Sequence, residues 1–217
     1  MPLITALEPT SRRLGGALLE VDNVPLCRVT DELRLRFGLA VGACLSREQV
    51  EALEQEAGAA EAMARALHYL SYRPRTILEV RSYLRKHGLE ARSDRAISRC
   101  AELGYLDDEA YAVSFVRDRI RLGPRGQPRL VSELLARGVD REIAEKAVGV
   151  ALADEDVTEE ELLRRVALRR LRSLRSVEPE VARRRLASFL GRRGFRTGAI
   201  RELVRELLPD EPDREGS

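Results

Sequence analysis

The sequence has few aromatic residues and few cysteines. Aromatic residues make up 4% of the 217 residues, and tryptophan is absent. The three cysteines, Cys27, Cys44 and Cys100, are odd in number and far apart, so they form neither a disulfide framework nor a metal cluster. This pattern predicts a protein of a reducing compartment whose core is built mainly from aliphatic side chains.

Long apolar runs and phosphate-binding loops are also missing. No stretch of about 18 apolar residues occurs, so no membrane-spanning helix is expected. Residues 1–10 lack the basic start and apolar middle of a signal peptide, and we therefore expect a cytoplasmic protein. No Gly-x-x-x-x-Gly-Lys-Ser/Thr loop is present, and Gly123-Pro124-Arg125-Gly126 is interpreted as a turn.

The sequence contains no constellation that predicts catalysis or metal binding. His68 and His87 have no cysteine or histidine at ligand spacing. Asp107 and Asp108 fit the capped start of a helix better than a cation site or an acid/base pair. We therefore expect a protein that is not an enzyme, with no catalytic residues, no metal and no cofactor.

One short phrase recurs three times in the chain. A leucine and a basic residue precede a glycine, which an apolar residue follows, at Gly88, Gly138 and Gly194. A helix that ends in this way places the glycine in the left-handed conformation, and the next apolar residue folds back onto the helix. The glycines are 50 and 56 residues apart, and this recurrence predicts a helical repeat array.

The predicted fold class is mainly α, with three tandem three-helix repeats that form an elongated modular array. The predicted repeats span residues 58–105, 106–153 and 154–208. A small N-terminal module with a β-hairpin and helices covers residues 1–57, and a disordered acidic tail covers 209–217. Because each repeat alone is too small for a good core, we expect neighbouring repeats to bury their shared apolar faces against one another.

Turn and cap signals place the elements. Asp22-Asn23 separates the apolar runs 14–21 and 24–29, which predicts a tight hairpin turn. Ser46 predicts the start of a helix that ends at about Glu56.

Further capping boxes are expected at Thr76 and Thr158, and Asp107 is the predicted N-cap of the second repeat. The helix that starts near Asp140 is expected to bury Ile143, Ala147 and Val150.

Arginine is almost the only cation, since Lys86 and Lys146 are the only lysines. Residues 164–205 hold fourteen arginines and three glutamates, although the whole chain carries a net charge of only +2. The surface that these arginines form is either a solvated charged face or a site for phosphates or for an acidic protein groove. The candidate partner- and DNA-binding residues are Arg73, Arg75, Arg117, Arg121, Arg125, Arg129, Arg169, Arg170, Arg172, Arg184, Arg185, Arg192 and Arg193.

Four segments carry a resemblance to a known family: residues 66–76, 104–112, 130–139 and 189–195. The most specific feature is Leu106-Asp107-Asp108 followed by an aromatic residue, and Arg193-Gly194-Phe195 comes next. Over roughly residues 58–208 the chain resembles the RecX family of bacterial recombination regulators. The connector Pro124–Pro128 is longer than the resemblance leads us to expect.

The resemblance implies a helical repeat protein that regulates the RecA recombinase and catalyses nothing. Members bind RecA and its filament on DNA, and they restrain strand exchange, ATP hydrolysis and co-protease activity by lodging in the filament groove or by promoting disassembly. The implied partners of this chain are therefore RecA and the RecA–DNA filament, with direct contact to single- and double-stranded DNA as a further expectation. We expect a monomer with no membrane partner.

Two other functions compete with this interpretation. Three-helix units can be variants of the helix-turn-helix, which would make the chain a DNA-binding transcription regulator. The predicted helix over 140–150 is mostly acidic and apolar, which argues against a base-reading role. An unrecognised hydrolase would need a pocket with perturbed carboxylates.

Overall fold

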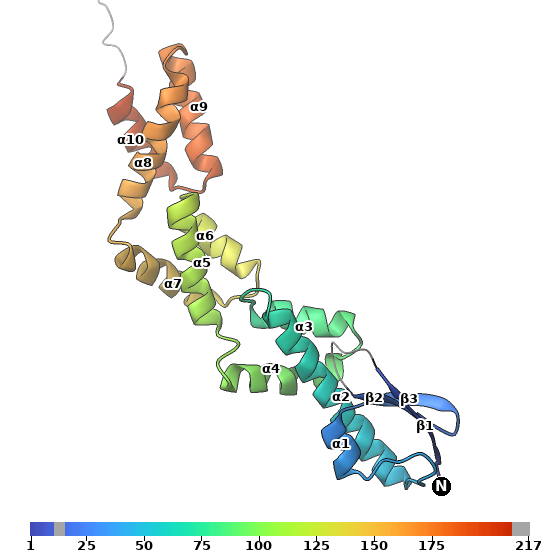
Figure 1. Cartoon of the computed structure of the whole chain (residues 1–217). Coiled ribbons are helices and arrows are strands. Elements are labelled where there is room, and N and C mark those ends of the chain that lie inside the picture. The colour runs from blue at the N-terminus through green and yellow to red at the C-terminus, as the bar shows by residue number, and fades with distance from the viewer. Residues whose placement is uncertain (11–15, 210–217) are drawn as a thin grey trace, which may run out of the picture. The chain divides into compact units, whose positions relative to one another are not determined.

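The computed structural model describes residues 1–10 and 16–209, and the chain divides after Asp107 into two units (Figure 1). Apart from Pro209, the predicted acidic tail lies outside the described residues, as does the start of the apolar run at Leu14. Within the described part, the chain is mainly helical, with ten α-helices and one small sheet.

The first unit begins with a three-stranded antiparallel sheet in the order β1-β2-β3. Its strands are β1 (Ile4–Pro9), β2 (Ala17–Val21) and β3 (Val24–Val29). Asp22 and Asn23 connect β2 to β3 with φ values of 50° and 62°, as a tight hairpin turn with two left-handed residues requires. The predicted hairpin is therefore confirmed.

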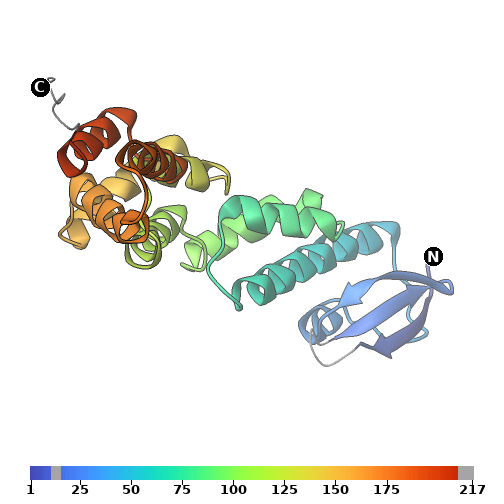
Figure 2. The same cartoon turned by 90° about the horizontal axis from the view of Figure 1, so that it is seen from above.

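A long helix joins the sheet to the first repeat. After α1 (Asp31–Arg36), α2 runs from Arg47 to Leu70, and Ser46 and Gln49 form its capping box. The predicted helix end at about Glu56 is wrong. Alanines follow that point, so the helix continues past Gly58 (Figure 2). Its buried Leu53 and Ala57 belong to the core of the sheet module, and its buried Ala62 and Ala66 belong to the core of the first repeat.

The first repeat packs the end of α2 against two further helices. These are α3 (Ile77–Lys86), which starts at a capping box on Thr76, and α4 (Ser93–Glu102), which follows the short 3₁₀ segment η1 (Glu90–Arg92). Ala66, Val80, Leu84 and Cys100 are fully buried between them. The first repeat thus has a small core of its own within the first unit.

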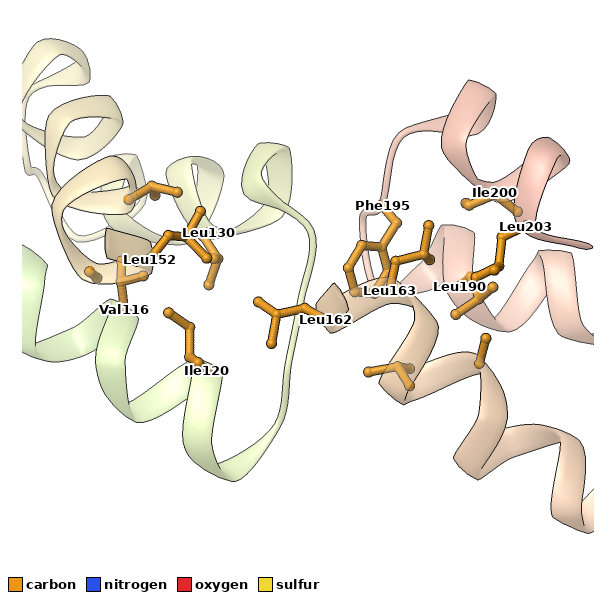
Figure 3. Packing of buried hydrophobic residues seen from close by; sticks show 14 of the residues in the cluster. Val116, Ile120, Leu130, Leu152, Leu162, Leu163, Leu190, Phe195, Ile200 and Leu203 are labelled. Carbon is orange, nitrogen blue, oxygen red and sulfur yellow. The ribbon is translucent and has the colours of Figure 1, made fainter. Parts of the chain in front are cut away.

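The second unit holds six helices around one continuous core. They are α5 (Asp108–Leu122), α6 (Gln127–Leu135), α7 (Arg141–Asp154), α8 (Glu159–Leu171), α9 (Pro179–Arg192) and α10 (Thr197–Leu207), with the 3₁₀ segment η2 (Arg172–Leu174) after α8. Figure 3 shows Leu162, at the start of α8, between Ile120 of α5 and the side chains of the last three helices. Shared burial therefore joins the second and third repeats.

The three recurring glycines end equivalent helices. Gly88, Gly138 and Gly194 follow α3, α6 and α9 with φ values of 74°, 81° and 78°. The apolar residue after each glycine is buried, and its N–H donates to the carbonyl of the leucine five residues earlier. The bonded pairs are Leu89–Leu84, Val139–Leu134 and Phe195–Leu190.

The predicted buried face of α7 is only partly right. Ala147 is buried, but Val150 is 39% exposed and Ile143 is half-buried. The helix instead buries Ala144, Val148 and Ala151, which lie one position further along. One residue corresponds to about 100° of rotation, so the small alanines face the core and Val150 faces away from it.

The connector between α5 and α6, residues 123–126, contacts the turn that ends α9. The Gly126 N–H donates to the Arg193 carbonyl at 3.0 Å, and a Cβ atom on Gly126 would overlap the backbone of Gly194. The Arg193 side chain donates to the carbonyl of Pro124 at 3.0 Å. The connector therefore closes the junction between the second and third repeats.

Candidate functional site

Two candidate arginines of α5 pair with acids at the end of α7. Arg117 pairs with Asp154, and Arg121 pairs with Glu155 through two guanidinium nitrogens, at 2.7 Å from Nη2 and 3.1 Å from Nε. The hydrogen bond from Arg121 holds the pKa of Glu155 below its ordinary value. These contacts tie α5 to the end of α7.

Glu133 on α6 collects three further arginines. It pairs with Arg125, with Arg119 at 3.3 Å and with Arg129 at 3.2 Å, and its own side chain is only 16% exposed. Burial, and then the neighbouring arginines, lower the pKa of the Arg125 guanidinium. One carboxylate thus holds three closely spaced positive charges together. We call Glu133 and these three arginines the Glu133 cluster.

The candidates Arg73 and Arg75 lie in the first unit and are also engaged. Arg73 pairs with Glu79 at 2.8 Å, and Arg75 lies 3.8 Å from the same carboxylate. The Arg75 guanidinium also stacks on the Tyr69 ring, with its carbon 4.1 Å from the ring centroid. Both residues therefore reinforce the start of α3.

The seven candidates of the third repeat behave differently. None of them forms an ion pair with an acid in residues 1–10 or 16–209. Arg170 and Arg193 are half-buried against the Phe189 ring, at 5.2 and 5.0 Å from its centroid, and the other five are exposed. These five are Arg169, Arg172, Arg184, Arg185 and Arg192.

Guanidinium groups without an acid partner suit the binding of phosphates or carboxylates, because their paired N–H groups match two oxygens at once. Among the described residues, no group of three or more His, Cys, Asp or Glu side chains is placed to hold a metal. No helix in the described part is long and apolar enough to cross a membrane. The guanidinium groups of these seven arginines therefore suit the third repeat to binding anions.

Sequence reasoning missed two residues that hold these arginines in place. Glu133 has Arg129 and Arg137 four positions before and after it, a helical spacing that signals side-chain pairing. Phe189 supports Arg170 and Arg193. No local pattern marks Phe189, because its role depends on how α8 packs against α9.

Three family models match the chain, each for one repeat. They describe the first, second and third three-helix domains of RecX, and they match residues 62–100, 107–148 and 158–204. Regulatory protein RecX of Lactobacillus delbrueckii subsp. bulgaricus is 30% identical over 215 residues, which cover 97% of this chain and 76% of the relative. Regulatory protein RecX of Thermobifida fusca is 35% identical over 154 residues, 70% of this chain and 81% of the relative.

Solved structures agree with these matches. A crystal structure of regulatory protein RecX superposes with a TM-score of 0.67 at 25% identity, over 97% of this chain and 100% of that one. A crystal structure of RecX from Lactobacillus salivarius gives a TM-score of 0.61 at 25% identity, over 69% of this chain and 96% of that one.

Proposed function

This chain belongs to the RecX family of regulatory proteins, and we propose that it is a negative regulator of the RecA recombinase. In this proposal the chain binds RecA and its nucleoprotein filament, in the filament groove. Binding inhibits strand exchange, ATP hydrolysis and co-protease activity in DNA repair and the SOS response. The chain acts as a monomer in the bacterial cytoplasm, where the recombinase works, and catalyses no reaction itself.

The observation that carries the proposal is the set of seven third-repeat arginines without an acid partner in the described residues. A recombinase filament on DNA is a long, highly charged target, and unpaired guanidinium groups are the side chains best suited to it. The candidate arginines of the second repeat are paired with acids, so they act mainly by holding α5, α6 and α7 together.

A helix-turn-helix transcription regulator is less well supported. The exposed positions of α7 include Glu142 and Glu145, and α7 ends at Asp154. A recognition helix in the major groove instead needs basic or amide side chains that reach base edges. The two basic residues of α7 are already engaged, because Arg141 pairs with Glu145 and Lys146 pairs with Glu109, so neither is free to contact the phosphates beside that groove.

The test is to titrate the protein into a reaction in which the cognate recombinase hydrolyses ATP on single-stranded DNA. We expect the rate to fall as the protein saturates the filament, with co-sedimentation on filaments confirming that binding takes place. Full hydrolysis at confirmed saturation would reject the regulator. Tight binding to one specific duplex without recombinase would instead support the transcription regulator.

A further inference from the structure

The second unit contains a cavity of about 320 Å³ where the end of α5 meets α8 and α9. The side chains of Arg165, Arg169 and Arg170 reach it from α8, and Arg193 reaches it from just past the end of α9. Phe189 and Ser173 complete its polar and aromatic lining, while Ile120, Leu122, Pro124 and Val166 supply its apolar lining. All of these residues lie in one unit, so the cavity belongs to a single packed body.

The charge in this cavity is one-sided. No carboxylate lines it, and its four α8 and α9 arginines form no ion pair with an acid in the part of the chain that the structure describes. A fifth lining arginine, Arg121, already has Glu155 as its partner. The Nε of Arg170 is buried and has no hydrogen-bond acceptor among the described residues. Four positive charges therefore converge on one space that holds no countercharge from the lining.

Two of these arginines are fixed in place. Arg170 and Arg193 both lie against the ring of Phe189, and an Arg193 Nη donates to the carbonyl of Pro124 at 3.0 Å. The Ser173 hydroxyl donates to the Arg170 carbonyl at 2.8 Å, which steadies the end of α8. Because these contacts set the guanidinium groups before any ligand arrives, an anion that binds loses little free energy to side-chain ordering.

We propose that this cavity binds the phosphodiester backbone of a DNA strand, and this inference rests on the proposed function for the presence of DNA. A strand carries one negative charge about every 3.4 Å, so two or three neighbouring phosphates meet several guanidinium groups at once. The cavity volume is at the lower end for small-ligand sites, which suits a sugar-phosphate segment and not a duplex. Because arginines already occupy the Phe189 ring, the bases of the strand face away from it.

The test compares two double variants that remove the same charge from the same repeat. Arg165→Gln with Arg169→Gln empties one side of the cavity, whereas Arg184→Gln with Arg185→Gln changes two exposed arginines of α9 outside it. None of the four residues forms an ion pair with a described acid, so both double variants are expected to fold. Thermal melting by circular dichroism confirms this before binding is measured.

Binding is measured by fluorescence anisotropy with a labelled single-stranded oligothymidylate, without recombinase, at several salt concentrations. We expect the cavity variant to lose about tenfold or more in affinity, because two charge-assisted contacts are lost, and the control to lose about two- to threefold. The log–log salt slope should flatten by about 1.4 in the cavity variant, at ~0.7 for each phosphate on a single strand.

Equal losses in the two double variants would overturn the proposal, since the surface would then act as diffuse charge. Stronger competition by polyglutamate than by unlabelled oligothymidylate of equal charge would overturn it in favour of an acidic protein segment. If wild-type protein inhibits the recombinase but does not bind the oligonucleotide, the cavity proposal fails and the proposed function stands. If it binds through the cavity but leaves ATP hydrolysis unchanged, the proposed function fails and the cavity proposal stands.

Discussion

The second and third repeats carry the same cation in quite different settings. In the second repeat, Arg117 and Arg121 are paired with acids at the end of α7, and the arginines of the Glu133 cluster are paired with Glu133. In the third repeat, the ion pair between Arg164 and Glu206 stands beside seven arginines with no acid partner among the described residues. The number of arginines in a segment therefore says little about binding until their partners are known.

Paired and unpaired arginines also differ in their effect on the stability of the protein. Paired arginines give up part of their hydration but gain a fixed acid, so their net effect on stability is small or moderate. Unpaired arginines on one surface repel one another, and water and salt weaken this repulsion only in part. The third repeat therefore keeps a repulsion that a bound polyanion would relieve, whereas Glu133 offsets part of the repulsion among the arginines of the second repeat.

Removing the acid at the centre of the Glu133 cluster should leave second-repeat arginines without a partner, as in the third repeat, and should cost the most stability of the changes considered. Glu133→Gln leaves Arg119, Arg125 and Arg129 together without a countercharge, and we expect unfolding to become easier by about 3 kcal/mol, as when one partner of a largely buried pair is lost. The measurement is urea unfolding followed by circular dichroism.

The matched control is Glu206→Gln, which removes the carboxylate of an ion pair whose two side chains are 50% and 54% exposed. Its midpoint should stay close to wild type, because exposed ion pairs are screened by water and salt. Equal losses in the two variants would show that Glu133 has no special role.

A larger residue at Gly126 should weaken the packing between the second and third repeats. Gly126→Ala places a methyl group against the backbone of Gly194, and we expect a loss of roughly 1–3 kcal/mol from this overpacking. Gly149→Ala, in open space within α7, should instead stabilise the protein by about 0.5–1 kcal/mol. If Gly126→Ala matched Gly149→Ala in urea unfolding, the close contact at the junction would be wrong.

Local signals in the sequence were enough to predict much of the fold. The recurring glycines, the capping boxes at Ser46, Thr76 and Thr158, and the hairpin turn each depend on residues a few positions apart. The predicted end of a helix at Glu56 failed because an alanine-rich sequence around one glycine does not stop a helix.

The candidate site was harder to predict, because pairing depends on contacts between distant segments. Arg117 and Asp154 are 37 residues apart, and Arg121 and Glu155 are 34 apart, so nothing local marks them as partners. The arginine-lined cavity needs α5, α8 and α9 at once. The sequence could therefore identify the arginine-rich repeat but could not separate engaged arginines from available ones.

Two single substitutions with small expected effects compare a paired arginine directly with one that has no described partner. Arg117→Gln removes a paired arginine, and Arg192→Gln removes one that has no acid partner among the described residues; both are single charge changes in the second unit. We expect Arg117→Gln to cost less than about 1 kcal/mol of stability and to leave DNA and filament binding unchanged. Arg192→Gln should leave the melting temperature unchanged and flatten the log–log salt slope of oligothymidylate binding by at most ~0.7. The opposite pattern, measured by melting and by anisotropy, would contradict the division between the repeats.

The single helix α2 also limits which insertions the first unit can accept during evolution. Its 24 residues extend about 36 Å, and its buried residues before Gly58 pack into the core of the sheet module, whereas those after Gly58 pack into the core of the first repeat. Inserting one residue near Gly58 would turn one half relative to the other by about 100° and shift it by about 1.5 Å. A lineage could therefore lengthen the loops of this unit freely, but it could lengthen α2 only by steps close to whole turns.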